Sequence, residues 1–406
     1  MKHLYKFSAI LLLSLAVIVM ACSSDDDDAP DLFPATAEAA VNTYADIVLA
    51  NYEDSRNDAQ TMLDAINAFV ASPSEASLTT ARQAWLNAQE SYGQTEVFRF
   101  YGGPIDDEDG PEGQLNAWPL DESLIDYVDI ASNGDDPNDN DGSNIINSPD
   151  DVPVINKDVI AGFNEVGAET NISTGYHAVE FLLWGQDTDL GAGGGNRPFT
   201  DFVTGEGGTR ENQDRRADYL VAAAELIIDD LNSLIAEWGA GGAYRTFFTS
   251  AAEIDNSIER ILNGMGKLSS GELAGERIAV AVDLKSVEDE HSCFSDNTHR
   301  DVVTNAKGIE NVFLGAYTRT NGTVIRGTGI YDVVKTRDEE LAESLRINVS
   351  NSVQLAEVIK APFEQELFDN AGIARLEAVI SSLEAQGQGL AEAASEFGFT
   401  FDPNDI

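Results

Sequence analysis

The sequence of 406 residues is poor in positive charge and in residues that bind soft metals: it has 24 lysines and arginines, four histidines and two cysteines. Against them stand 71 aspartates and glutamates, which leaves a formal charge of −47. A surface this acidic repels phosphate backbones, so nucleic acid is excluded as the expected partner. The same charge keeps a protein soluble and raises the local concentration of cations, metal ions included.

One of the two cysteines, Cys22, lies at the end of a predicted N-terminal targeting segment. Residues 1–6 are basic, residues 7–20 are almost wholly apolar, and the run Val-Met-Ala-Cys ends at Cys22. This run resembles the lipobox of bacterial lipoproteins, so we predict a signal peptide over residues 1–21 and a lipid on Cys22. A plain signal peptide is the alternative, and the apolar run is too short for a comfortable membrane span. Cys293 is then the one other cysteine, which excludes an intramolecular disulfide.

Residues 22–35 form a predicted acidic tether, in which two serines and four aspartates follow Cys22. An acidic run is usually a solvated linker. It also resembles a signal for surface export in some Gram-negative bacteria. We therefore expect an outer-membrane lipoprotein, attached to the membrane through Cys22, whose folded part faces either the cell surface or the periplasm.

Helical periodicity dominates the rest of the chain. Apolar residues recur at three- and four-residue spacing, alanine, leucine and glutamate are plentiful, and long alternating runs of β-branched residues are scarce. The pattern predicts an all-α protein built from helix bundles. The predicted helices are 37–50, 57–71, 78–100, 215–238, 246–265, 300–317, 338–361 and 373–385.

Two stretches interrupt the helical pattern. Residues 133–153 are rich in Asp, Asn, Gly and Pro, and residues 191–208 are rich in glycine, so both are typical of loops. The second loop can separate two helical halves of similar length. We therefore predict a first helical-bundle domain over residues 36–205 and a second over residues 206–406.

The stretch GYHAVEFLLWG, residues 175–185, places His177 and Glu180 inside an otherwise apolar run. Residues three apart share one face of a helix, so both side chains can reach one ion. Imidazole and carboxylate suit zinc, iron, copper or manganese. The spacing is neither His-Glu-x-x-His nor His-x-x-Glu-His, so it supplies two ligands at most. A structural hydrogen-bonded pair is the alternative interpretation.

Three stretches carry a resemblance to a known family. GYHAVEFLLWG matches the Gly-x-His-x-x-Glu motif of the imelysin family, which includes insulin-cleaving metalloprotease-like proteins. Residues 95–128, with TEVFRFYGGP and AWPLDES, and residues 291–317, which begin HSCFSDNTHRD, resemble two further motifs of that family. The resemblance extends from about residue 36 to 385. It implies two all-helical domains, each related to a four-helix bundle, with the motifs in a cleft between them.

The resemblance also implies roles for individual residues. His177 and Glu180 are the predicted metal ligands, and Glu96 would complete the shell or orient His177. Arg99 would pair with a carboxylate or hold an anionic ligand. The remaining cleft candidates are Asp121, Ser295, Asp296, His299 and Asp301, with His291 close to the same motif. For Asp121 the alternative is a helix-starting acid, and one of Ser295, Asp296 and Thr298 is the predicted N-cap of the helix that follows.

Two classes of function follow from this reading. The first is a lipoprotein that binds a divalent or ferric metal ion, such as iron or zinc, or a small metal-containing ligand. Such a protein would serve iron acquisition together with iron-uptake partners. The second is a zinc-dependent peptidase, which needs a metal with an open position, a general base and a substrate groove. A metal-free surface binding protein is a third possibility. The sequence favours binding over proteolysis, because Glu180 cannot easily serve as both ligand and base.

Overall fold

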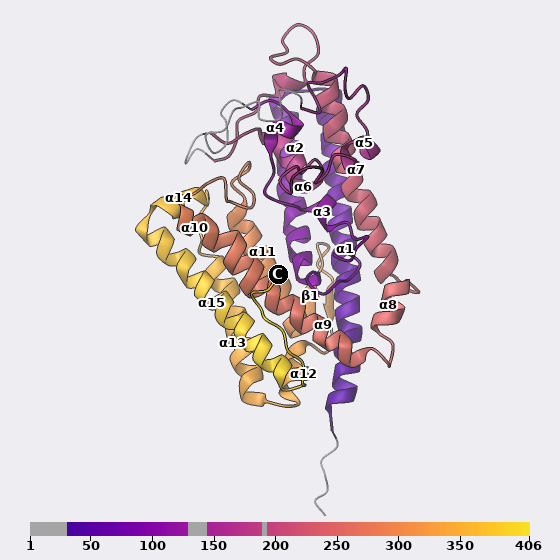
Figure 1. The fold of residues 1–406 in the computed structure, drawn as a ribbon, viewed down its shortest axis with the longest axis vertical. Helices are drawn as coiled ribbons and strands as arrows, with labels where there is room; N and C mark the ends of the chain where they lie inside the picture. Colours follow the sequence, from indigo (N-terminus) through magenta and orange to yellow (C-terminus); the bar gives the residue numbers. More distant parts are fainter. Residues whose placement is uncertain (1–30, 129–143, 189–192) are drawn as a thin grey trace, which may run out of the picture. The chain divides into compact units, whose positions relative to one another are not determined.

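The computed structural model describes residues 31–128, 144–188 and 193–406 (Figure 1). The predicted signal peptide, Cys22 and most of the tether lie outside these ranges, as do parts of both predicted loops. Residues Leu32–Ile406 group into one compact unit. No helix in the described part of the chain has the length and apolar character that a membrane crossing needs.

Four helices pack together in the first half of the unit. They are α1 (Phe33–Ala71), α2 (Glu75–Tyr92), α6 (Gly175–Trp184) and α7 (Gln213–Trp238), with α1 against α2 and α7, and α6 against α2 and α7. The indole of Trp85 on α2 donates to the carbonyl of Tyr176 on α6 at 2.9 Å, and both side chains are fully buried. Burial of a large side chain of this kind contributes about 1.5–3 kcal/mol.

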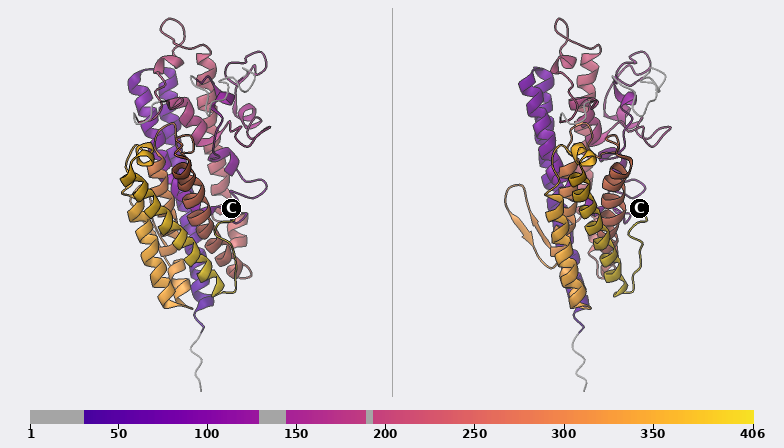
Figure 2. Two further views of the ribbon diagram at one scale, coloured as in Figure 1. Left: turned by 60° about the vertical axis from the view of Figure 1, so that its left-hand side comes forward. Right: turned by 90° about the vertical axis from the view of Figure 1, so that its left-hand side faces the viewer.

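A second group of helices follows in sequence and lies beside the lower part of α1 in Figures 1 and 2. It consists of α9 (Ile254–Lys267), continued by the π-helical segment η4 (Leu268–Ala279) and α10 (Val280–Leu284), with α11 (Thr298–Leu314), α13 (Glu339–Ala356) and α15 (Asn370–Ser395). α15 packs against η4, α9 and α13, and α13 packs against α11. The groups meet where α11 crosses the 3₁₀ segment η1 (Gly93–Phe98) and where α9 touches α1.

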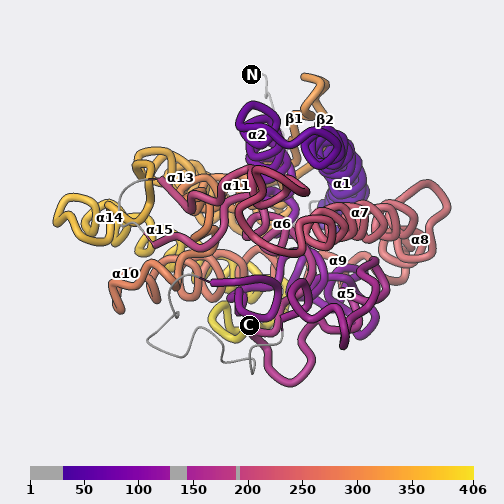
Figure 3. The backbone as a smooth tube through the Cα atoms, turned by 90° about the horizontal axis from the view of Figure 1, so that it is seen from above, coloured from indigo at the N-terminus to yellow at the C-terminus, as the bar shows by residue number. Residues whose placement is uncertain are grey.

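The remaining elements are short and connect the long helices (Figure 3). They are α3 (Glu112–Leu115), α4 (Glu122–Ile125), α5 (Lys157–Ala161), η3 (Phe199–Phe202), α8 (Ala243–Phe248), α12 (Ile330–Lys335) and α14 (Glu364–Phe368). A hairpin of β1 (Ala316–Thr318) and β2 (Val324–Arg326) pairs antiparallel, with Tyr317 opposite Ile325. Everything else that is regular among the described residues is helical.

The all-α class that the periodicity predicts is confirmed. The first two predicted helices merge into the single helix α1 of 39 residues. Ser74 caps α2 and Asp338 caps α13, each through a side-chain oxygen that accepts from a backbone N–H of the first turn. The hairpin was not predicted, because three-residue strands carry too little alternation to be recognised. The division into domains at residues 205 and 206 stays a prediction; α7, which follows it, packs against α1 and α6 of the first group.

Candidate functional site

The Gly-x-His-x-x-Glu motif forms α6, a helix of 10 residues that are all buried. Gly175 begins it with a φ of 82°, and a Cβ at this position would lie 2.5 Å from the carbonyl oxygen of Leu115. Only glycine fits so close an approach at positive φ. The motif glycine therefore allows α6 to pack closely against the backbone of α3. The segment that follows α3 lies near the same end of α6.

His177 and Glu180 meet on one face of α6, as their spacing predicts. Nδ1 of His177 lies 2.9 Å from Oε2 of Glu180, and the side chains are 1% and 0% exposed. The backbone N–H and the hydroxyl of Ser295 donate to Oε1 of Glu180 at 2.9 and 2.6 Å. Nε2 of His177 is buried and has no hydrogen-bond partner among the described residues. An imidazole whose Nδ1–H is held by a carboxylate keeps its lone pair on Nε2, which is the usual state of a metal-ligating histidine.

A second histidine–carboxylate pair comes from the other helical group. Nδ1 of His291 lies 2.9 Å from Oδ2 of Asp301 on α11, which also accepts from the Ser292 hydroxyl at 2.6 Å. The rings of His177 and His291 have centroids 4.7 Å apart and stand at 86° to one another. Each helical group therefore contributes one buried imidazole that is oriented by a carboxylate.

Glu96 lies beside this pair but is held by two arginines. Oε2 of Glu96 accepts from Arg277 at 2.6 Å and from Arg99 at 2.8 Å. Its Oε1 lies 3.3 Å from the amide nitrogen of Asn116, which is itself 3.5 Å from Nε2 of His291. Glu96 thus connects the arginines to His291 through Asn116.

Two more glutamates complete the arginine network. Arg99 pairs with Glu112 at 2.9 Å, and Arg277 pairs with Glu272 at 2.8 Å. We call the whole set the buried polar cluster. Its members are Glu96, Arg99, Glu112, Asn116, His177, Glu180, Glu272, Arg277, His291, Ser292, Ser295, Asp301 and Asn305, whose side-chain oxygen accepts from Arg277 at 2.6 Å.

Burial and neighbouring charge set the protonation of these groups. Burial raises the pKa of Glu96, but Arg277 and Arg99 outweigh it and bring the pKa to about 2. Burial lowers the pKa of His291 well below its usual value, and Arg277 and His177 lower it further. Burial also raises the pKa of both Glu180 and Asp301. His291 is therefore neutral at physiological pH, the form in which imidazole binds metals.

Three predicted residues lie outside this cluster. Asp121 is the N-cap of α4 and accepts from the backbone of Ser123 at 2.9 Å, so its alternative role as a helix-starting acid is confirmed. His299 is half-buried and contacts the carbonyl of Asp296 at 3.1 Å. The side chain of Asp296 faces a separate acidic cavity.

The prediction that Ser295, Asp296 or Thr298 is the N-cap of α11 was wrong. The N-cap of α11 is Asn297, whose side chain makes no capping bond. Ser295 instead donates to Glu180, and the Thr298 hydroxyl accepts from the backbone of Ser292 at 3.0 Å. These contacts stabilise the turn that carries His291, so the polar residues before α11 serve the cluster rather than the helix end.

Sequence reasoning missed six members of the cluster: Glu112, Asn116, Glu272, Arg277, Ser292 and Asn305. Asn116 lies within a stretch that resembles the family, two residues before Trp118, and could have been found there. Glu272 and Arg277 are five residues apart, a spacing that separates them on an α-helix and brings them together on the π-helical segment η4. No periodicity in the sequence signals that change.

The fold and the cluster together define an all-helical protein with a buried site of imidazoles and carboxylates at the junction of two helical groups. The sequence model of the imelysin family matches residues 48–390. The protein belongs to the imelysin family.

A relative in sequence and two solved structures agree with this assignment. The iron-regulated protein A of Synechococcus elongatus is 23% identical over 336 residues, which cover 80% of this chain and 76% of that protein. A structure assigned as an iron-regulated protein A precursor from Parabacteroides distasonis has a TM-score of 0.68 at 20% identity, covering 90% of this chain and 95% of that one. An imelysin-like protein from Psychrobacter arcticum gives 0.59 at 11% identity, covering 90% and 97%. At these identities the structures establish the shared fold.

Proposed function

We propose that this protein binds a transition-metal ion, with iron as the first candidate, through Nε2 of His177 together with His291, and that it serves iron acquisition. The observation that carries the proposal is the buried Nε2 of His177, which lacks a hydrogen-bond partner while Nδ1 is fixed by Glu180. A buried polar atom without a partner is costly, and a metal ion would satisfy it. The name of the relative in Synechococcus supports iron over other metals.

The chemistry of the site fits such an ion. The cluster contains five carboxylates and two guanidinium groups, so it is net negative when these groups are ionised. Neutral imidazole suits zinc and iron, and the carboxylates on Nδ1 raise the basicity of the ligand atoms. Glu96 is paired with two arginines, which favours a role in fixing the surrounding side chains. A bound ion would be held by His177 and His291 and oriented by Glu180 and Asp301.

Burial favours ion binding over the alternative of zinc-dependent proteolysis. His177, Glu180, Glu96 and His291 are each at most 4% exposed. A peptidase must bring a peptide bond to a metal that keeps an open position. A bare ion can reach this site through small fluctuations, whereas a peptide would require the two helical groups to separate.

Titration of Fe²⁺, under anaerobic conditions, and of Zn²⁺ into the purified protein tests the proposal. We expect one tight site per chain, whose affinity falls strongly in His177→Ala. His299→Ala is the matched control, because His299 lies outside the cluster, and it should bind as the parent does. Equal binding in parent and His177→Ala would refute the site. Cleavage of casein or insulin by homogeneous protein, abolished by a chelator, would support the peptidase instead.

We also propose that a lipid on Cys22 attaches the protein to the outer membrane, as the lipobox-like run suggests. The support is the order of a basic segment, an apolar run and a cysteine followed by an acidic tether. Labelled palmitate should enter the parent protein and not a Cys22→Ser variant. Protease treatment of intact cells would then distinguish the surface-facing from the periplasm-facing arrangement.

A further inference from the structure

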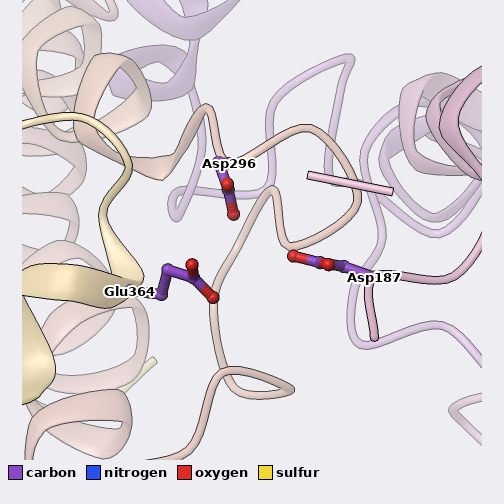
Figure 4. A group of neighbouring side chains, drawn as sticks. All are labelled: Asp187, Asp296 and Glu364. Atoms are coloured by element: carbon purple, nitrogen blue, oxygen red, sulfur yellow. The ribbon is translucent and has the colours of Figure 1, made fainter. Parts of the chain in front are cut away.

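Three carboxylates from distant parts of the chain meet beside the buried polar cluster. Asp187 follows α6, Asp296 lies in the turn before α11, and Glu364 begins α14. One ligand oxygen from each lies within 4.8 Å of the others, and Figure 4 shows the three carboxyl groups directed toward a common space. Asp296 and Glu364 are buried and Asp187 is half-buried. Such a convergence is unfavourable for like charges unless something positive lies between them.

A small cavity lies next to these groups. Its lining includes Asp187 and Asp296 together with three further acids, Glu122, Glu288 and Glu290. The cavity is small, with room for about a single water. Asp296 is 6% exposed, and its Oδ2 has no hydrogen-bond partner among the described residues. A buried carboxylate oxygen without a partner, directed at two other carboxylates, points to a bound cation.

The electrostatics of the cavity agree with this. Burial and, to a smaller extent, the charge of Asp187 raise the pKa of Asp296 to about 7. Burial and, to a smaller extent, the charges of Glu122 and Asp187 raise the pKa of Glu288 to about 7. Burial and, to a smaller extent, the charges of Asp296 and Glu364 raise the pKa of Glu290 well above its usual value. The main charges that act on these carboxyls are all negative, so a cation would relieve several repulsions at once.

We propose that Asp187, Asp296 and Glu364 bind one Ca²⁺ ion. Carboxylate oxygens are the ligands of hard cations, and no histidine belongs to the group. Cys293 lines the cavity, but burial raises the pKa of its thiol well above the usual value, so it offers no thiolate to a soft metal. Mg²⁺ usually binds through one or two carboxylates and keeps several waters, whereas Ca²⁺ accepts several carboxylates in flexible geometry.

The proposed calcium site connects to the histidine site through adjacent residues. Ser295, which donates twice to Glu180, directly precedes Asp296. A calcium ion would join the segment after α6, the turn before α11 and α14, and would thereby hold Ser295 against Glu180. Calcium is therefore expected to stabilise the fold and to tighten metal binding at His177. The calcium site itself does not depend on the proposed function of the histidines.

Calcium titration by calorimetry, with thermal unfolding beside it, tests the proposal on the full purified protein after treatment with a chelator. We expect one Ca²⁺ per chain with a Kd of about 1 mM or tighter, measured at about 0.15 M salt to suppress weak surface binding, and a rise in Tm. Asp296→Asn and Glu364→Gln should lose both effects. Without calcium these variants should unfold at the same or a higher temperature than the parent, because each removes a like charge.

Controls separate this site from the acidic surface and from the histidines. Glu377→Gln removes one exposed carboxylate from α15 and should keep calcium binding, as should His177→Ala. Asp187→Asn, at a half-buried position, provides a third variant if one of the buried ones folds poorly. Absence of calcium binding in the parent, retention of binding in all three site variants, or binding of Mn²⁺ or iron without Ca²⁺ would each overturn the assignment.

Discussion

The pairing of Glu96 with Arg277 and Arg99 predicts a large, pH-dependent loss of stability for Glu96→Gln. The carboxyl is 1% exposed, and its pKa is lowered from 4.5 to about 2. A shift of this size corresponds to about 3 kcal/mol of stability near pH 7, at about 1.4 kcal/mol for each pH unit. The variant removes the one carboxylate that both buried guanidinium groups share, which fits the about 3–5 kcal/mol cost of breaking a buried pair.

The sign of the pH dependence follows from the direction of the shift. A carboxyl with a lowered pKa in the folded state stabilises the protein above its unfolded pKa of 4.5 and loses that contribution as the pH falls toward about 2. The difference in unfolding free energy between parent and Glu96→Gln should therefore shrink from about 3 kcal/mol near pH 7 to about 1 kcal/mol near pH 3.

Urea unfolding followed by circular dichroism measures this difference. Glu377→Gln, on the exposed face of α15, is the matched control and should change stability little at either pH. A loss below about 1 kcal/mol near pH 7, or a loss that does not depend on pH, would refute the reasoning, because a buried carboxylate held by two arginines cannot give either result.

Three further substitutions have expected outcomes. Gly175→Ala should lower the urea midpoint by the equivalent of about 1–3 kcal/mol, since it places a Cβ at positive φ against the backbone of α3. Asp126→Asn should cost about 3–5 kcal/mol in the same assay, because the carboxylate accepts from both Arg197 and Arg216 at 2.6 Å in the interior. Ser295→Ala should weaken metal affinity about 10–100-fold in a chelator competition while the helical circular dichroism stays unchanged, because it removes a donor that positions Glu180.

The sequence predicted those features that depend on local periodicity. Apolar spacing gave the long helices, and the i, i+3 spacing of His177 and Glu180 predicted their contact on α6. Glycine at position 175 belonged to a recognisable motif, but the reason for it, the backbone of α3 at 2.5 Å, depends on a tertiary contact that no local pattern describes.

The parts of the site that were missed depend on irregular helix geometry and on distant contacts. On an α-helix, five residues rotate the side chain by about 500°, so Glu272 and Arg277 would point about 140° apart. The π-helical hydrogen bonding of η4 brings them to 2.8 Å. Asp187 and Glu364 are separated by most of the second half of the chain, and their approach to Asp296 follows only from the packing of the two helical groups. Whether His177, Glu180 and Glu96 bind a metal stays a prediction.

X-ray absorption spectroscopy at the iron edge of iron-loaded protein tests the central claim most directly, because it reports which atoms surround the ion. The account predicts the multiple scattering of imidazole rings in the parent, and its loss or reduction in His177→Ala and in His291→Ala but not in His299→Ala. A coordination shell of oxygen alone, unchanged in both cluster variants, would contradict it and would place the iron at the carboxylates instead.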